Sequence, residues 1–400
     1  MNLLPKPKKI TEKGGQLLLC HSMYIVISKE ISDNGIYAAK RLQEAIRQET
    51  GLLLRLSVGE TRDGDFSLRI TETLSEQAYE ITINENGVQI LGGDGAGVLY
   101  GVETFCQILQ QYGGALSCMQ IMDAPDMPNR GYYFDQTRGR ILKLEELKKI
   151  ADRMSLYKLN QLQLYVEHTY LFRDFSEMWR DQTPITAEEI RELDSYCRER
   201  HIELVPSLAS FGHLCTLLST KTYGDLCEME DSWKEPFSFW NRMRYHTINV
   251  SDGRSLPLIK KMIAEYMQLF SSDKFNICAD ETFCLGKYKS KELAKECGIH
   301  RLYIDYVKEL AQFLVENGKI PMFWGDIIWN SPELMKELPE TMVCLNWGYA
   351  PEQREDETRA IAQTGAMQYL CPGVCGWNQW ANLIENSYKN ITRMCNYAAK

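Results

Sequence analysis

The chain has 400 residues, of which 44% are hydrophobic and 25% charged, and its formal net charge is -9 at pH 7. This length exceeds one ordinary domain, and the composition supports a sizeable buried core without a signature of disorder. The acidic balance argues against a nucleic-acid partner, because binding phosphates needs a basic face. No run of 18 apolar residues occurs, so no membrane span is expected.

The N-terminus, the cysteines and the histidines bear on compartment and cofactors. The opening sequence MNLLPKPKKITEKGG has too short an apolar run for the core of a secretion signal. Thirteen cysteines form no repeated CxxC pairs, which is typical of reduced thiols in a cytoplasmic protein. The six histidines show no HxH or HExxH spacing. We therefore expect a cytoplasmic location, no metal site and no cofactor.

Residues 1–122 are predicted to form a small α+β domain. Strand-like runs separated by glycine, asparagine and aspartate turns occupy Ser67–Ile70, Tyr79–Ile83 and Gly87–Gly92. Apolar residues at helical spacing predict helices near Gly35–Thr50 and Gly95–Gln111.

Residues 123–400 follow a different rhythm, which begins after the proline-containing linker Met122–Pro128. Short apolar runs alternate with amphipathic helices, which predicts repeated βα units and a parallel sheet. The predicted strands are Gly131–Asp135, Gln161–Val166, Ile202–Ser207, Lys274–Asp280, Ile320–Trp324, Val343–Trp347 and Gln368–Cys371. The predicted helices include Leu144–Tyr157, Ala187–Arg200, Leu256–Ser271, Ile304–Asn317 and Asn382–Ala399.

Two features favour closure of this sheet into a (β/α)8 TIM-type barrel. Polar and aromatic residues follow most predicted strands, and the carboxyl ends of barrel strands converge on one face where chemistry is assembled. No GxGxxG or GxxxxGK[ST] motif follows a strand, so a nucleotide-binding open sheet is disfavoured. Only seven strands are recognisable, so the last βα unit is either missed or absent.

Asp280 and Glu281 are the candidate catalytic residues, at the end of the apolar run that begins at Phe275. One alternative is that one carboxylate caps the next helix while the other faces solvent. Two neighbouring carboxylates in a confined pocket resist joint ionisation, however, which makes a general acid available near neutral pH. The end of a barrel strand is the place where such a pair is expected to act.

Aromatic and basic residues near the strand ends predict a sugar pocket. Aromatic rings pack on the C–H face of a sugar, and five of the eight tryptophans fall after residue 320, at Trp324, Trp329, Trp347, Trp377 and Trp380. Core packing is the alternative for one or two of them. Arg138 could bind adjacent hydroxyls as a multi-donor fork or form a structural salt bridge. His213 could orient an acid or be a satisfied loop histidine.

Several motifs resemble glycoside hydrolase family 20, the β-N-acetylhexosaminidases. Arg130–Arg138 (RGYYFDQTR) is similar to the family's opening barrel strand, Val205–His213 (VPSLASFGH) to its third-strand motif, and Ile277–Glu281 (ICADE) to its Gly-Gly-Asp-Glu motif. Tyr79–Gln110 resembles the small domain that precedes the family's barrel. The resemblance spans nearly the whole chain.

The resemblance implies exo-acting release of terminal β-linked GlcNAc or GalNAc from an oligosaccharide or glycoconjugate, by a retaining mechanism in which the substrate's own acetamido group attacks. Asp280 would orient that group and Glu281 would act as acid and base. Arg138 would bind O3 and O4, and His213 would support the acid. The remaining substrate-binding candidates are Trp324, Trp347, Trp377 and Tyr349, with Tyr369 as the second choice for the tyrosine that contacts the acetamido oxygen.

This chain departs from the family pattern in four places. Cys278-Ala279 replaces two glycines, and Phe211 stands where the family has proline. The family's Asp-rich segment after the second strand is replaced by Tyr165–Tyr170, where Glu167 is a substitute candidate for substrate binding. The tryptophan and carboxylate of the family's eighth strand are not found.

Two alternatives remain open from the sequence. One is a barrel glycosidase with two separated carboxylates, Glu281 acting with Glu167 or Asp326. The other is a non-catalytic or truncated sugar-binding barrel. Dependence of turnover on the 2-acetamido group separates the first from the proposed hexosaminidase, and binding without turnover would mark the second.

Overall fold

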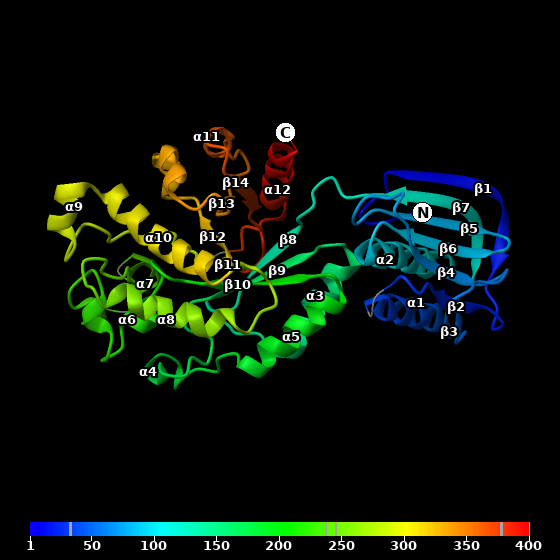
Figure 1. The fold of residues 1–400 in the computed structure, drawn as a ribbon, viewed down its shortest axis with the longest axis horizontal. Coiled ribbons are helices and arrows are strands. Elements are labelled where there is room, and N and C mark those ends of the chain that lie inside the picture. The colour runs from blue at the N-terminus through cyan, green and yellow to red at the C-terminus, as the bar shows by residue number, and fades with distance from the viewer. Residues whose placement is uncertain (32–33, 235, 237, 245, 377–378, 400) are drawn as a thin grey trace. The chain divides into compact units, whose positions relative to one another are not determined.

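The computed structural model describes all residues except 32–33, 235, 237, 245, 377–378 and 400 (Figure 1). The chain divides into two compact units. The first comprises Met1–Tyr132, Leu144–Leu162 and Glu192–Glu203, and the second comprises Tyr133–Lys143, Gln163–Arg191 and Leu204–Lys400. The boundary expected between residues 122 and 123 stays a prediction.

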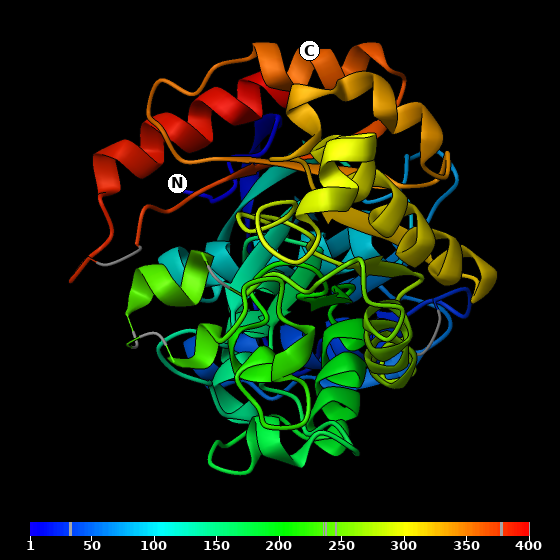
Figure 2. The ribbon, with the colours of Figure 1, turned by 90° about the vertical axis from the view of Figure 1, so that its left-hand side faces the viewer.

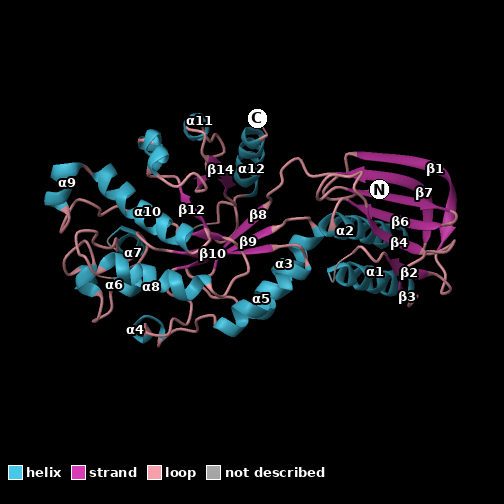
Figure 3. Cartoon of the chain, in the orientation of Figure 1, coloured by secondary structure: helices cyan, strands magenta, loops and turns pink. Residues whose placement is uncertain are grey.

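The N-terminal part of the chain forms a mixed seven-stranded sheet in the order β1-β7-β5-β6-β4-β2-β3 (Figure 3). Strand β5 pairs antiparallel with β6 and β7, whereas β4 pairs parallel with β2 and β6. The strands are β1 (Lys9–Leu18), β2 (Tyr24–Ile27), β3 (Arg55–Val58), β4 (Phe66–Ile70), β5 (Tyr79–Asn84), β6 (Gly87–Gly92) and β7 (Ala115–Asp123).

Two helices, α1 (Asn34–Thr50) and α2 (Gly95–Tyr112), contact each other and the strands of this sheet. Helix α2 begins at Asp94, whose carboxylate accepts the backbone N–H of Gly97 at 2.7 Å and so satisfies a donor of the first turn. Its apolar face is buried, with Phe105 edge-on to Phe66 at 5.4 Å between ring centroids. The predicted helices and the strands β4, β5 and β6 are confirmed.

The C-terminal part of the chain forms a second seven-stranded sheet in the order β14-β13-β12-β11-β10-β9-β8. Neighbours in this sheet are consecutive in the chain, and the pairs from β10 to β14 are parallel, as in a TIM-type barrel. The strands are β8 (Gly131–Asp135), β9 (Gln161–Val166), β10 (Glu203–Leu208), β11 (Lys274–Asn276), β12 (Ile320–Trp324), β13 (Val343–Gly348) and β14 (Met367–Pro372). The described residues contain no eighth strand between β14 and β8.

Helices alternate with these strands, and those that pack most closely on the sheet are α10 on β12 and α11 and α12 on β14 (orange and red in Figure 2). The α-helices after β8 are α3 (Leu144–Leu156), α4 (Ser176–Trp179), α5 (Ala187–Glu199), α6 (Cys215–Leu218), α7 (Phe239–Arg244), α8 (Ser255–Met267), α9 (Lys291–Cys297), α10 (Ile299–Glu316), α11 (Asp356–Gln363) and α12 (Ile384–Ala398). The 3-10 helices are η1 (Gly224–Leu226), η2 (Ser232–Lys234), η3 (Ile328–Asn330) and η4 (Pro332–Glu337). None of the helices in the described residues is long and apolar enough to cross a bilayer.

Local sequence explains much of this second sheet. Every residue of β9 is buried, as expected for a parallel strand covered on both faces. Helix α5 begins at a capping box, in which the backbone N–H of Thr186 donates to Glu189 and the N–H of Glu189 donates back to the Thr186 hydroxyl. One prediction was wrong in extent, because β11 ends at Asn276 and not at Asp280. The residues after Asn276 leave the strand conformation.

Candidate active site

The segment after β11 carries the two candidate catalytic carboxylates on an irregular backbone. Cys278, Ala279 and Glu281 have φ values of 57°, 65° and 50°, in the left-handed region that non-glycine residues seldom occupy. Each such residue costs of order 1–3 kcal/mol and persists only where the surroundings fix it. The turn explains why the strand ends early, and why the family has glycines at the positions of Cys278 and Ala279.

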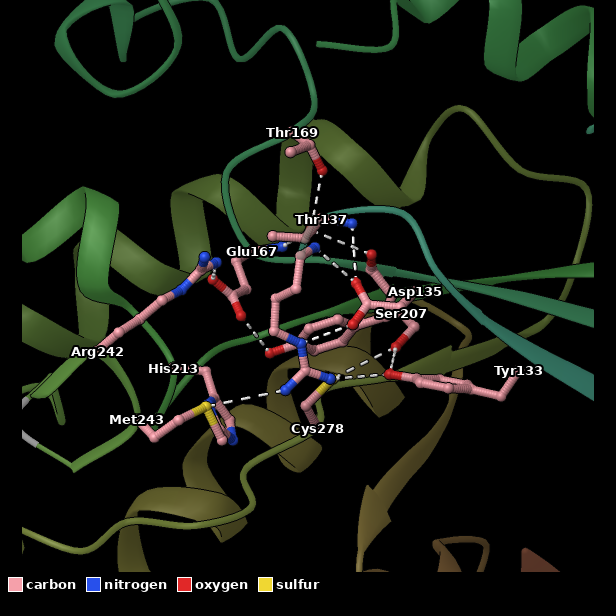
Figure 4. A network of polar contacts seen from close by, with 12 residues as sticks. Tyr133, Asp135, Thr137, Glu167, Thr169, Ser207, His213, Arg242, Met243 and Cys278 are labelled. Atoms are coloured by element: carbon pink, nitrogen blue, oxygen red, sulfur yellow. Dashed lines mark hydrogen bonds and ion pairs between the residues drawn. The ribbon is translucent and has the colours of Figure 1, made fainter. Parts of the chain in front are cut away.

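Hydrogen bonds from neighbouring elements fix this turn. The backbone N–H of Trp324 in β12 donates to the carbonyl of Cys278 at 2.9 Å. The hydroxyl of Tyr303 in α10 donates to the carbonyl of Ala279 at 3.0 Å, and both groups are buried. The thiol of Cys278 lies 3.3 Å from the hydroxyl of Ser207 in β10 (Figure 4). Three different elements therefore stabilise the strained conformation.

His213 joins the two carboxylates. Its Nε2 lies 3.3 Å from Asp280 Oδ2 and 3.2 Å from Glu281 Oε2, and its side chain is only 3% exposed. Burial alone would lower the pKa of His213, but the negative charge of Asp280 and the hydrogen bonds to both carboxylates outweigh it and raise the pKa to about 10. An imidazolium therefore bridges the pair near neutral pH. The structure brings together the three residues that the sequence predicted for acid–base chemistry.

Gly212 allows this approach. A Cβ at residue 212 would overlap the carbonyl oxygen of Asp280 and crowd that of Glu281. The loop after β10 can therefore lie against the main chain of the carboxylates only because residue 212 has no side chain. His213, the next residue, itself has a φ of 59°.

Asp326 is a third carboxyl in the same place. It follows β12, and its Oδ2 accepts the backbone N–H of Glu281 at 3.0 Å. Burial, together with the charge of nearby Asp280, raises the pKa of Asp326 to about 8. The sequence placed Asp326 among the polar residues at the strand ends, and named it as one possible partner of Glu281 in a separated pair. Its position directly after Trp324-Gly325, at the end of a barrel strand, was the signal that could have placed it beside Glu281.

Arg138 forms the salt bridge that the sequence left as an alternative. Its Nε lies 2.6 Å from Asp135 Oδ2, and the guanidinium carbon lies 4.8 Å from the centre of the Tyr165 ring. Asp135 Oδ1 accepts the backbone N–H groups of Thr137 and Arg138. Because Asp135 engages Nε, the terminal Nη groups are those that Arg138 can offer to a ligand. Nη1 lies 3.9 Å from the sulfur of Met243.

Glu167 is buried beside this network and is 3% exposed. Its Oε1 accepts the Tyr165 hydroxyl at 2.9 Å, and its Oε2 accepts Nη2 of Arg242 in α7 at 2.8 Å. Both oxygens are thus occupied by protein donors. The predicted contact of Glu167 with substrate stays a prediction, and the role that the structure gives this residue is to hold α7. Sequence reasoning missed Arg242, which has no recognisable local motif.

Aromatic side chains line the strand ends of β12 and β13. Trp324 is 7% exposed and packs edge-on against Tyr133 at 4.9 Å. Trp347 stacks with Tyr349 at 4.9 Å, and Trp329 lies 5.8 Å from Trp347. The indole N–H of Trp347 is buried and finds no hydrogen-bond partner in the described part of the chain. It is a donor suited to a ligand.

Tyr349 lies close to the carboxylates. Burial of its hydroxyl and the negative charges of Asp280 and Glu281 raise the pKa of Tyr349, while 37% of the residue remains exposed. This position suits the predicted contact with an acetamido oxygen. Tyr369, the second choice, lies on β14 opposite Leu345. Trp377 lies outside the described residues.

The carboxylates and His213 could also be considered as metal ligands. Their ligand atoms lie within 4.8 Å of one another, a spacing that a cation would fit. The contacts of His213 Nε2 with both carboxylates account for this spacing by ion pairing. The expected absence of a metal or cofactor stays a prediction.

Comparison with known families agrees with this geometry. Residues 1–124 match "Glycosyl hydrolase family 20, domain 2", and residues 127–399 match "Glycosyl hydrolase family 20, catalytic domain". The chain belongs to glycoside hydrolase family 20. The resemblance inferred from the sequence motifs is confirmed.

Individual relatives are distant. A beta-hexosaminidase of Porphyromonas gingivalis is 23% identical over 365 residues, which are 82% of this chain and 46% of that protein. The chain therefore spans about half the length of this curated relative. The fold is similar to that of Flavobacterium johnsoniae chitobiase, with a TM-score of 0.80, 20% identity and coverage of 93% of this chain and 59% of that one. It is also similar to a Vibrio harveyi exo β-N-acetylglucosaminidase solved with N-acetylglucosamine, with a TM-score of 0.74, 20% identity and coverage of 93% and 60%.

Proposed function

We propose that this chain of family 20 is an exo-acting β-N-acetylhexosaminidase, which releases terminal β-linked GlcNAc or GalNAc from an oligosaccharide or glycoconjugate with retention of configuration. The observation that carries the proposal is the clamp of His213 on Asp280 and Glu281, at 3.3 and 3.2 Å. It directs two consecutive carboxylates to one side of the site. The names of the relatives support the same activity.

In the proposed reaction the substrate supplies its own nucleophile. The oxygen of the 2-acetamido group attacks the anomeric carbon while Glu281 donates a proton to the leaving glycosidic oxygen, giving a cyclic oxazolinium ion. Asp280 accepts the acetamido N–H and stabilises the positive charge that develops on that group. Glu281 then takes a proton from water, which opens the ring on the face that the aglycone left. Both displacements invert, so the net outcome is retention.

The arrangement of carboxylates around Glu281 favours this mechanism over one that uses a separated pair of carboxylates. The usual glycosidase pair flanks the scissile bond at roughly 5–9.5 Å, from opposite sides. Here Asp280 and Glu281 share one histidine, and Asp326 contacts the main chain of Glu281 from within the same cluster. Glu167 is held by Tyr165 and Arg242. Asp280 and Asp326 therefore belong to one cluster with Glu281, and both oxygens of Glu167 are engaged by protein donors.

The rest of the proposed site binds the sugar. The terminal Nη groups of Arg138 would donate to O3 and O4, as the family resemblance implies. Trp324 and Trp347 would wall the acetamido pocket, and Tyr349 would donate a hydrogen bond to the acetamido oxygen as charge develops on that group. Glycan partners beyond the terminal N-acetylhexosamine are not specified by these contacts.

A cytoplasmic location is part of the proposal. All thirteen cysteines lie in the described part of the chain and are free, and seven of them are buried. Free thiols are typical of a reducing compartment. Cell fractionation of the native host would test this: recovery outside the cytoplasm would contradict it.

The decisive experiment is hydrolysis of p-nitrophenyl β-N-acetylglucosaminide by the wild type, Asp280→Asn and Glu281→Gln, beside the matching β-glucoside. We expect turnover of the acetamido substrate only, and a loss of at least about a hundredfold in each variant. Proton NMR of the first product should show the β-anomer. Turnover of the glucoside, or full activity of Asp280→Asn, would contradict the mechanism. Binding of N-acetylglucosamine without turnover would favour the non-catalytic barrel.

A further inference from the structure

Asp326 contacts the main chain of the proposed acid Glu281, but it has no role in the reaction proposed above. Its Oδ2 accepts the backbone N–H of Glu281 at 3.0 Å. Glu281 is held at a φ of 50°, which a residue with a side chain adopts only when the surroundings impose it. The hydrogen bond from its own N–H is a direct restraint on that conformation. The orientation of the Glu281 carboxyl therefore depends on Asp326.

The second oxygen of Asp326 is in a different situation. Oδ1 is buried and has no hydrogen-bond partner within the described residues, and Oδ1 of Asp280 is in the same condition. A buried carboxylate oxygen without a donor is costly when it carries negative charge. Two such oxygens on neighbouring acids disfavour the doubly ionised state further. Burial and the charge of Asp280 accordingly raise the pKa of Asp326.

Among the described residues, the titratable groups that act most strongly on Asp326 are not cations. Asp280 and Glu281 approach it from the segment after β11, Tyr303 from α10 and Cys344 from β13. All four are neutral or negative. The imidazolium of His213 is hydrogen-bonded to the other two carboxylates. A proton on Asp326 itself lowers the cost of burying its carboxyl beside two other acids.

We propose that Asp326 is a positioning residue that acts as a neutral acid: its carbonyl oxygen anchors the Glu281 main chain, and its proton allows Asp280 to keep the negative charge. The inference rests on the proposed function, in which Asp280 must be anionic to stabilise the oxazolinium ion. Ionised Asp326 would compete with that role by repelling Asp280 and loosening the cluster. Asp326 touches the backbone of Glu281 and not the substrate.

Three variants test this. Asp326→Asn keeps a carbonyl acceptor of the same shape and is always neutral, Asp326→Leu removes the acceptor, and Asp181→Asn is a matched control at an exposed acid. We expect Asp326→Asn to keep kcat within about threefold and to extend activity to higher pH, because the charge that forms on Asp326 in the wild type is gone. We expect Asp326→Leu to lower kcat at least about thirtyfold with little change in KM, because only positioning of the acid is lost. Asp181→Asn should match the wild type in rate and pH profile.

A measurement that needs no turnover separates this inference from the proposed function. Infrared difference spectra of the wild type between pH 6 and 10 should contain a buried carboxylic acid band that Asp326→Asn lacks. If the wild type does not hydrolyse the N-acetylglucosaminide, the proposed function fails, and this band alone decides the state of Asp326. Absence of the band, equal losses in the Asn and Leu variants, or full activity of a folded Asp326→Leu would each overturn the proposal. If the Leu variant does not fold, the pH profile of Asp326→Asn and the band decide it.

Discussion

The mixed sheet of β1–β7 and the strand ends of the parallel sheet differ in how many of their residues adopt strained backbone conformations. Among the described residues in the region of β1–β7, only Gln77 is a non-glycine residue with positive φ. Around Asp280 there are four, namely His213, Cys278, Ala279 and Glu281, out of nine in the described chain. The first region is stabilised by an apolar core and needs almost no strained backbone conformations. The second holds strained residues through hydrogen bonds from other elements, so strain concentrates where chemistry is proposed.

Unsatisfied polar atoms show the same contrast. The buried side-chain atoms that lack partners in the described residues include Asp280 Oδ1, Asp326 Oδ1 and the indole nitrogen of Trp347, all at the candidate site. In the mixed-sheet region the hydroxyl of Ser28 is in this condition. A site prepared for a ligand leaves donors and acceptors open that a structural core would pair. The predictions below test whether activity and stability divide between the two regions in this way.

The largest expected effect is on activity, from His213→Ala. Removing the imidazolium leaves Asp280 and Glu281 without the cation that joins them. We expect kcat/KM for the N-acetylglucosaminide to fall at least about a hundredfold, a typical loss for a disabled acid–base group. Steady-state kinetics on a variant shown to be folded by circular dichroism would check this. Retention of a tenth of the wild-type rate would mean that the clamp is not needed.

The matching change in the mixed-sheet region is Phe105→Ala. Phe105 is fully buried against Phe66, and its truncation leaves a cavity. We expect a loss of about 3–5 kcal/mol in the free energy of unfolding of that region. The kcat of the remaining folded protein should be close to that of the wild type. Urea unfolding followed by circular dichroism measures the first, and kinetics at low temperature measures the second. A kcat loss comparable to that of His213→Ala would remove the contrast.

We expect the free energy of unfolding to decrease as pH rises, because folding raises the pKa values of two groups in the candidate site. The pKa of His213 is raised from 6.5 to about 10, so its contribution is full below 6.5 and is lost as pH rises through about 10. The pKa of Asp326 is raised from 3.8 to about 8, and its contribution is likewise lost as pH rises through about 8. Each shift of one unit corresponds to about 1.4 kcal/mol. Urea unfolding between pH 5 and 10 should show the decline.

Asp326→Asn is the control for that decline. It cannot ionise, so the part of the fall that occurs below about pH 8 should flatten, whereas the part due to His213 should persist. A variant with an unchanged slope throughout would show that folding does not raise the pKa of Asp326.

The smallest expected effect comes from the substitution Ala→Gly, made at one position in each region. Ala39 lies fully buried inside α1, where Ala→Gly costs about 1 kcal/mol or more. Ala279 is as deeply buried but has a φ of 65°, a conformation that glycine adopts without penalty. We expect Ala279→Gly to lie within about 1 kcal/mol of the wild type, because relief of strain offsets the lost methyl group. Equal costs at both positions, from thermal unfolding, would argue against strain at Ala279.

Local patterns predicted the strands and helices of the barrel well, since β8, β9 and β12 have the bounds that the sequence indicated. They predicted less where structure depends on distant contacts. Strand β1 is polar and exposed along nearly all its length and has no alternation to recognise. The end of β11 at Asn276 follows from hydrogen bonds made by β12 and α10, which no reading of residues 274–281 alone contains.

The candidate site likewise contains some residues whose roles could be predicted from the sequence and others whose roles could not. The motif around Asp280, Glu281 and His213 could be found from the sequence because strand ends carry chemistry in this fold. The partners Asp326 and Arg242 could not be assigned, since their roles come from positions 45 and 75 residues away in the chain from Glu281 and Glu167, respectively. The strand-end position of Asp326 indicates that it lies near Glu281 but not that it accepts the Glu281 N–H, and Arg242 has no local signature at all.

Gly212 also matters for protein engineering. Even a methyl group at residue 212 would push the His213 loop away from the main chain of Asp280, while Arg138, Trp347 and Tyr349 stand on other elements. If the proposed function holds, a chain with alanine there would retain the proposed sugar-binding walls but lose the alignment of the proposed acid. Such a variant would then serve as a reagent for capturing glycans that end in N-acetylhexosamine, obtained by adding a single carbon atom.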